Sequence, residues 1–195
     1  MKVNFVKTFI PVKDFVEKEK VGNKILVRFD AVKDADTDAY SCVEGSVLAS
    51  EYNEQEMQRE YEAWKQKWAE KALILAKKAK IAEITAYDTS SSVNGFMLNG
   101  LLVWLDKATR VGLMNSTTIA KAEGQETTTL WLGGLKLVVD CDKAIQLLSA
   151  LEMYALECFN MTASHKAAVG ELKTIEEVKV YDYKTGYPKM LEMSV

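Results

Sequence analysis

Residues 51–87 contain neither glycine nor proline, and this run constrains the fold more than any other part of the chain. Glutamates crowd its beginning and lysines dominate residues 65–80, so it predicts one helix, with Ser50 as the N-cap. At 1.5 Å per residue this helix is roughly 55 Å long. Such a length exceeds one side of a small globule, so the helix either folds back over strands of its own chain or pairs with other helices.

Apolar residues recur along this helix at spacings of three and four. A strict heptad pattern would have one spacing of four fewer. This row of apolar residues, here called the seam, is therefore expected to run nearly straight along the helix. We expect a homo-oligomer to form through the seam; the alternative is that it covers the chain's own strands. Early acids and late lysines favour an antiparallel or staggered pairing over a parallel, in-register bundle. The residues expected at the oligomer interface are Met57, Tyr61, Trp64, Trp68, Ala72, Leu75, Ala79 and Ala82.

The segments on either side of the helix predict an α+β fold with three parts: a β-rich segment (1–50), the long helix (51–87) and a C-terminal α+β domain (88–195). In the first part, residues 25–29 and 40–44 alternate as strands do. The loop 33–38 carries three alternating aspartates. It lacks the Gly and Glu that a calcium loop needs at its sixth and twelfth positions, so we interpret it as a solvated hairpin turn.

The C-terminal part predicts the order hairpin, helix, hairpin, helix. Asn99-Gly100 and Gly133-Gly134 mark the two turns. Asp106 is the expected N-cap of a helix over about 107–123. Asp140 or Asp142 caps a second helix over about 143–160, whose apolar residues cover most of its circumference and predict a buried central helix. Residues 174–177 form a capping box for a last short helix, and residues 190–195 favour a final strand.

Composition narrows the classes of function. The net charge is −3, and all of the acidic excess lies in residues 88–195, which carry 13 acids and 10 bases. Because no part is basic, we expect no nucleic-acid partner. No signal peptide or membrane span is expected, so no membrane partner is either. Three widely spaced cysteines suggest a reducing compartment and no disulfide framework.

The sequence shows no catalytic motif, so we expect no enzyme, no cofactor and no metal site. A nucleophilic pair would have to join Cys158 or Cys141 to His165. Cys158 and His165 are seven residues apart, which separates them by about 10 Å along a continuous helix, beyond hydrogen-bond reach. A histidine at the helix end that bonds a backbone carbonyl is the simpler interpretation. Arg110 could hold a partner's carboxylate, although a local pair with Asp106 is simpler. Trp104 and Trp131 are expected in the core, and the alternative is that an exposed tryptophan anchors an interface.

Residues 93–188 resemble a family of domains of unknown function common in bacteriophage and prophage gene clusters, often near tail-fibre genes. The resemblance lies in the "NG…VWLD" hairpin, "TTTLW" followed by "LKLVVD", the apolar helix ending in "TASH", and the closing "YD…GYP". It implies a structural component of a virion tail, fibre or appendage, located in the virion after assembly in the bacterial cytoplasm. Its partners would be further copies of itself and neighbouring phage structural proteins. A fibre assembly chaperone and a small enzyme or ligand-binding module using Cys158 and His165 are the alternatives.

Overall fold

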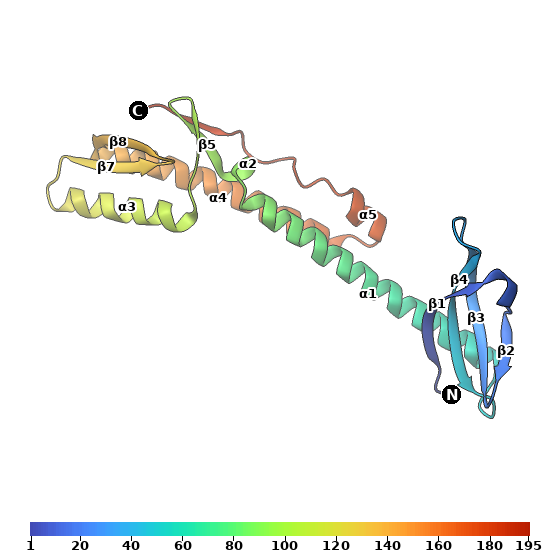
Figure 1. The fold of residues 1–195 in the computed structure, drawn as a ribbon. Helices are drawn as coiled ribbons and strands as arrows, with labels where there is room; N and C mark the ends of the chain where they lie inside the picture. The colour runs from blue at the N-terminus through green and yellow to red at the C-terminus, as the bar shows by residue number, and fades with distance from the viewer. The chain divides into compact units, whose positions relative to one another are not determined.

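A computed structural model describes all residues 1–195 and confirms the α+β fold class (Figure 1). The chain forms two compact units, Met1–Ala72 and Leu73–Val195. The division falls within the long helix α1 (Glu54–Asp88), which the sequence had predicted as a separate part.

The N-terminal unit is a four-stranded antiparallel sheet in the order β1-β4-β3-β2, with the first part of α1 packed on one face. The strands are β1 (Asn4–Pro11), β2 (Lys18–Val21), β3 (Lys24–Lys33) and β4 (Ala39–Leu48), and the short 3-10 helix η1 (Val12–Asp14) follows β1. Residues that alternate along the strands meet α1 in an aromatic cluster. In it, Phe29 stacks on Tyr61 at a centroid distance of 4.1 Å, and Phe5 lies 5.9 Å from Tyr61.

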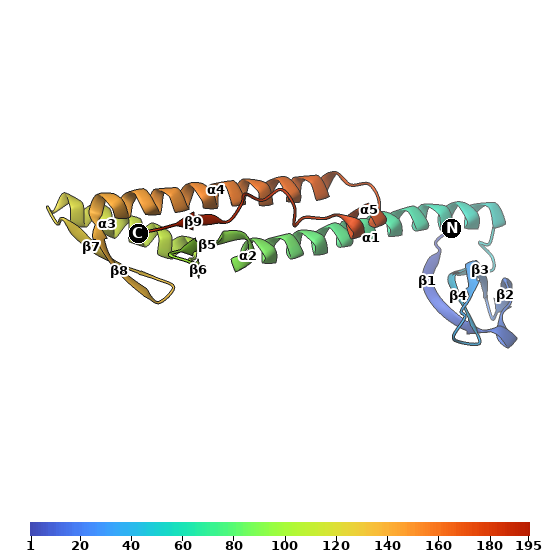
Figure 2. The same cartoon turned by 90° about the horizontal axis from the view of Figure 1, so that it is seen from above.

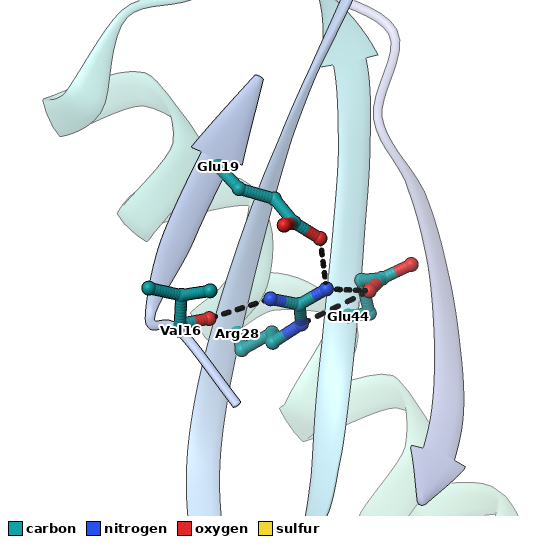
Figure 3. A network of polar contacts seen from close by, with 4 residues as sticks. All are labelled: Val16, Glu19, Arg28 and Glu44. Carbon is teal, nitrogen blue, oxygen red and sulfur yellow. Dashed lines mark hydrogen bonds and ion pairs between the residues drawn. The ribbon is translucent and has the colours of Figure 1, made fainter. Parts of the chain in front are cut away.

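Arg28, on β3, ties several strands of this sheet together (Figure 3). Its Nε donates to Glu44 on β4 at 3.1 Å, and its Nη1 donates to the carbonyl oxygen of Val16 at 2.6 Å. Its Nη2 forms an ion pair with Glu19 on β2. Because the guanidinium side chain is only 6% exposed, these partners satisfy a charge that would be costly to bury alone.

The beginning of α1 differs from the prediction. Ser50 is not the N-cap, because it lies in a turn in which the Glu51 N–H donates to the Leu48 carbonyl at 2.9 Å. The side chain of Asn53 instead accepts the N–H of Glu56 at 3.0 Å, so the helix starts three residues later than expected.

The C-terminal unit combines two hairpins with three helices that follow α1 and the short α2 (Ser91–Asn94) (Figures 1 and 2). A three-stranded sheet has the order β6-β5-β9, in which β9 pairs with β5 in parallel. The second sheet is the β7–β8 hairpin. The remaining elements are β5 (Gly95–Leu98), β6 (Leu101–Trp104), α3 (Lys107–Ala122), β7 (Thr127–Leu132), β8 (Leu135–Asp140), α4 (Cys141–Glu171), α5 (Ile175–Val180) and β9 (Leu191–Met193).

Several local signals found in the sequence are confirmed in this unit, but the predicted cap of α4 is not, because the side chain of Asp140 at its N-cap makes no capping hydrogen bond. Asn99 and Gly100 have φ angles of 50° and 80°, as the predicted hairpin turn requires. Asp106 caps α3 by accepting the N–H of Thr109 at 2.8 Å. The capping box of Thr174 and Glu177 precedes α5. The core lies between α4 and the strands, with Phe96, Leu98, Leu132 and Leu148 almost fully buried.

Helix α4 is longer and less buried than predicted. It runs to Glu171 and not to about residue 160, because nothing between Phe159 and Gly170 interrupts it. One face is buried, through Leu148, Leu151, Ala155, Cys158, Thr162, His165 and Val169. Met153, Leu156 and Phe159 on the other side are exposed, so the prediction of a central helix buried over most of its circumference was wrong.

Candidate interaction groove

The seam residues of α1 fall into two groups. Met57 and Tyr61 are each 2% exposed in the N-terminal unit, so they pack within the chain and have almost no surface left for another one. Trp64 is half-buried against Phe5 at a centroid distance of 5.6 Å, and Trp68 stacks on Trp64 at 5.4 Å while remaining 46% exposed. The first half of the seam therefore covers the sheet of its own unit.

The second half of the seam is open. Leu75 is 57% exposed, and Ala79 and Ala82 are exposed as well, while Ala72 is half-buried. In the C-terminal unit the buried residue of α1 is Ile84, on a different face of the helix. An oligomer interface through Leu75, Ala79 and Ala82 stays a prediction.

The C-terminal unit carries a groove of about 450 Å³. Its walls come from the end of α1, α2, the β6–α3 junction and the middle of α4. The lining residues are Asp88, Thr89, Asn94, Trp104, Leu105, Asp106, Lys107, Arg110, Glu152, Ala155, Leu156 and Phe159. Most of the groove surface is apolar, which is typical of sites that bind other molecules.

Arg110 is the most buried charged residue of the groove, at 8% exposure. Its Nε donates to Glu152 on α4 at 2.8 Å, and its Nη1 donates to the Leu105 carbonyl at 2.8 Å. The predicted pair with Asp106 is absent, because the two carboxylate oxygens of Asp106 accept the N–H and the hydroxyl of Thr109. These two hydrogen bonds also lower the pKa of Asp106 below its ordinary value.

Three large apolar side chains line the same groove as Arg110 without being buried. Trp104 is 41% exposed, Leu156 48% and Phe159 60%. The prediction that Trp104 and Trp131 lie in the core was wrong, since Trp131 is 59% exposed on the β7–β8 hairpin. Both tryptophans stand on the outward side of short strands whose opposite side supplies the core. Exposed apolar side chains and an arginine in one groove are the composition typical of a protein-binding surface.

Cys158 and His165 do not form a nucleophilic pair. The Cys158 thiol donates to the Val93 carbonyl at 3.2 Å, and burial raises its pKa. His165 lies in the interior of α4 and not at its end, which corrects the prediction. Its Nε2 lies 2.9 Å from the Thr185 carbonyl oxygen and its Nδ1 lies 2.9 Å from the Tyr181 hydroxyl. Because a carbonyl only accepts, Nε2 is the donor in the hydrogen bond to Thr185.

A polar cluster beside His165 holds the C-terminal segment on α4. The Thr162 hydroxyl donates to Asp88 at 2.7 Å and lies 2.9 Å from the Tyr187 hydroxyl. The Tyr154 hydroxyl donates to the Val93 carbonyl at 2.8 Å. All of these groups have partners within the protein, so the cluster stabilises the fold. No group of three or more His, Cys, Asp or Glu side chains is placed to hold a metal ion.

Residues 75–185, more than half of the chain, match the family described as Domain of unknown function (DUF4376). The chain belongs to this family. The matched DUF4376 segment begins within α1 and contains every residue that lines the groove. The search of curated proteins found no match, and neither did the search of solved structures. None of the helices is both long enough and apolar enough to span a membrane.

The groove is not visible in the sequence. The sequence suggests a carboxylate partner for Arg110, but it does not identify Glu152, because 42 residues separate the two and no local pattern joins them. One signal was available: Met153, Leu156 and Phe159 extend the apolar surface of α4 beyond what one buried face needs.

Proposed function

We propose that this DUF4376 protein is a non-enzymatic structural protein of a bacteriophage or prophage virion, as a component of a tail, fibre or other appendage. Its copies associate through α1, and its C-terminal unit attaches to a neighbouring structural protein through the groove. The observation that carries attachment is the exposed set Trp104, Leu156 and Phe159, which lines one groove together with the buried Arg110. The phage setting rests on the resemblance of the domain to a family found near tail-fibre genes.

The composition of the groove supports attachment over catalysis. Tryptophan and arginine are the residues that most often contribute large parts of a binding free energy in protein interfaces. By contrast, the groove lining contains no cysteine, serine or histidine, and His165 uses both ring nitrogens in contacts within the fold. Asp106 is engaged as a helix cap, and Glu152 pairs with Arg110.

The first experiment is mass spectrometry of purified particles from the source phage, with copy number measured against the major capsid protein. Stoichiometric presence at a small multiple of three, six or twelve supports a virion component. Absence from particles together with abundance in the infected-cell lysate would overturn it in favour of a fibre assembly chaperone. A particle-bound chain should also lose its attachment when Phe159→Glu is introduced, because the charge would lie on the groove wall, whereas Ile119→Glu on exposed α3 should not affect attachment.

Self-association is tested at the exposed part of the seam, which contains Leu75, Ala79 and Ala82. Leu75→Glu combined with Ala79→Glu should lower the mass measured by light scattering, because both side chains are exposed and free to contact another copy. Trp64→Ala with Trp68→Ala is a different test, since it also removes contacts within the N-terminal unit and should lower that unit's stability. An unchanged mass in the Leu75 and Ala79 variant would contradict association through α1.

A further inference from the structure

We propose that Asn99 is a site of spontaneous deamidation and that this modification loosens the C-terminal strand β9 from β5. Asparagine followed by glycine is the dipeptide most prone to the reaction, because glycine has no side chain to keep its backbone nitrogen away from the asparagine amide. The chain contains this dipeptide twice, at Asn94-Gly95 and at Asn99-Gly100. The fold leaves only the second one free to react.

The reaction needs only water besides the two residues. The Gly100 nitrogen bonds the Asn99 Cγ and gives up its proton, while the bond from Cγ to Nδ2 breaks and Nδ2 leaves as ammonia with that proton. Water then opens the cyclic imide on either side of its nitrogen. Opening at Cγ gives aspartate, and opening at the main-chain carbonyl carbon gives isoaspartate, in which the chain runs through Cβ and Cγ. Either product carries one more negative charge than asparagine.

The reacting groups of Asn99-Gly100 are exposed and little restrained. The two residues form the turn between β5 and β6, and both are exposed. The Gly100 N–H donates to no group of the protein, and only chain neighbours lie within 4 Å of the position that a Gly100 side chain would take. The Asn99 Oδ1 accepts the Val195 N–H at 3.0 Å, and the leaving Nδ2 has no partner. Attack on Cγ requires a rotation of the Asn99 backbone, which an unpacked turn permits through a small local opening.

The groups of Asn94-Gly95 are held on every side. The attacking N–H, that of Gly95, donates to the Ser91 carbonyl at the end of α2. The leaving Nδ2 of Asn94 donates to the Asp88 carbonyl at 2.7 Å. The Gly95 carbonyl accepts the Tyr154 hydroxyl at 3.1 Å, and Gly95 itself is buried. Reaction at Asn94 therefore requires part of the core to open first.

Asn99 also holds β9 in place, so its modification has a structural effect. β9 pairs with β5 in parallel (Figure 2), and beyond the last pair the Asn99 N–H donates to the Met193 carbonyl at 2.9 Å. Isoaspartate inserts an extra carbon atom into the main chain of this tight turn, whose length fixes the register of the hairpin. The bonds of Asn99 to Met193 and Val195 then lose their geometry. Because β9 has only three residues, few other bonds hold it.

The first test compares the two dipeptides in the full-length protein, aged at mildly alkaline pH in buffer and in urea, by peptide mass spectrometry. In urea they should react at similar rates, because large apolar residues flank both. In the native protein Asn99 should react at least about tenfold faster than Asn94, which needs local unfolding first. A native ratio of the two rates no larger than the ratio in urea would overturn the assignment of the site. So would a native Asn99 that stays intact while both sites react in urea.

Two variants check that the change arises at Asn99. Asn99→Gly removes the amide and supplies a residue that tolerates the positive φ angle of the turn, so the hairpin should still form. It should abolish the acidic form that accumulates in the aged native protein. Asn115→Gln is the matched control, since Asn115 is exposed on α3 and precedes a serine; this variant should age as the natural chain does. An acidic form that accumulates equally fast in Asn99→Gly would contradict reaction at Asn99.

The loosening of β9 is tested on the aged form, which anion exchange separates by its added charge. Hydrogen exchange of the Asn99 amide should become at least about tenfold faster than in the intact form. The Glu123 amide, which bonds the Ile119 carbonyl at the end of α3, should keep its protection. Equal protection of the Asn99 amide in both forms would overturn the effect on β9. A location in the virion is not needed for any of these results.

Discussion

The hydroxyl of Thr162, in the middle of α4, donates a hydrogen bond of 2.7 Å to the carboxylate of Asp88, the last residue of α1. The same hydroxyl lies 2.9 Å from that of Tyr187, so one buried threonine joins the end of one helix, the interior of another and the C-terminal segment. Threonine in a helix interior usually bonds its own backbone. In this protein the Thr162 hydroxyl makes tertiary contacts, so its loss should lower the stability of the whole C-terminal unit.

Replacing Thr162 by the isosteric valine should lower the free energy of unfolding of the C-terminal unit by about 1–3 kcal/mol. The substitution keeps the volume but removes the hydrogen bonds to Asp88 and Tyr187 in a site that is 2% exposed. Urea unfolding measures the change. Thr118→Val is the matched reference, because the exposed Thr118 hydroxyl bonds only the Met114 carbonyl. Equal effects of the two substitutions would contradict the tertiary role.

The pair of Arg110 and Glu152 should be coupled more strongly than a surface ion pair. Glu152→Leu leaves the buried guanidinium without its carboxylate and should cost about 1–3 kcal/mol of stability. Adding Arg110→Met should recover part of this loss, so that a double-mutant cycle measured by urea unfolding gives a coupling of about 1 kcal/mol or more. The exposed pair of Lys179 and Glu176 is the reference, expected below about 0.5 kcal/mol. A coupling free energy no larger than that of the reference pair would show that burial does not strengthen the ion pair of Arg110 and Glu152.

The cap of α5 should make this helix sensitive to acid. The Glu177 carboxylate accepts the N–H groups of Lys173 at 2.8 Å and Thr174 at 2.9 Å, and these bonds lower its pKa. Because the folded pKa lies below the unfolded value of about 4.3, the stabilisation is present above that value and is lost as the pH falls through the folded pKa. The exchange protection of the Val178 amide, which bonds the Thr174 carbonyl, should therefore fall in acid.

Glu177→Gln should remove most of this pH dependence, since the amide does not titrate. Glu176→Gln, one residue away and outside the capping box, should leave it as in the natural chain. The same acid profile in both variants would show that another group causes it.

The three cysteines should be unreactive in the folded protein. All three are buried, and burial raises the pKa of Cys42 and of Cys158. A chromogenic disulfide reagent at pH 8 should find no fast-reacting thiol in the native chain and three after unfolding in urea. A single fast thiol that Cys158→Ala removes would revive the enzyme alternative.

A structural feature of this protein is predictable from the sequence when the residues that determine it lie close together along the chain. The turn at Asn99-Gly100, the cap at Asp106 and the box of Thr174 and Glu177 involve residues at most four apart, and all three are confirmed. Helical spacing likewise predicted most of α1 and the existence of α4.

Features determined by distant partners were not predictable in this way. Trp104 and Trp131 are large apolar residues of the kind expected in a core. Only the arrangement of the strands on α4 decides that they face outward. Arg110 had a plausible local partner, yet that partner was needed as a helix cap. The seam of α1 is periodic along its whole length, but periodicity does not reveal that a sheet covers its first half alone.

The parallel pairing of β9 with β5 has a consequence for biosynthesis. The carbonyl of Met193 accepts the N–H of Asn99, and the Val195 N–H donates to the Asn99 side chain, 96 residues earlier in the chain. A ribosome releases the β5–β6 hairpin long before it translates Leu191, so one edge of β5 stays unpaired for most of the synthesis of this unit. A truncated messenger RNA that ends before this codon would give a chain in which one edge of β5 stays unpaired. Such an edge can pair with other chains, so the product is a target for chaperones and proteases.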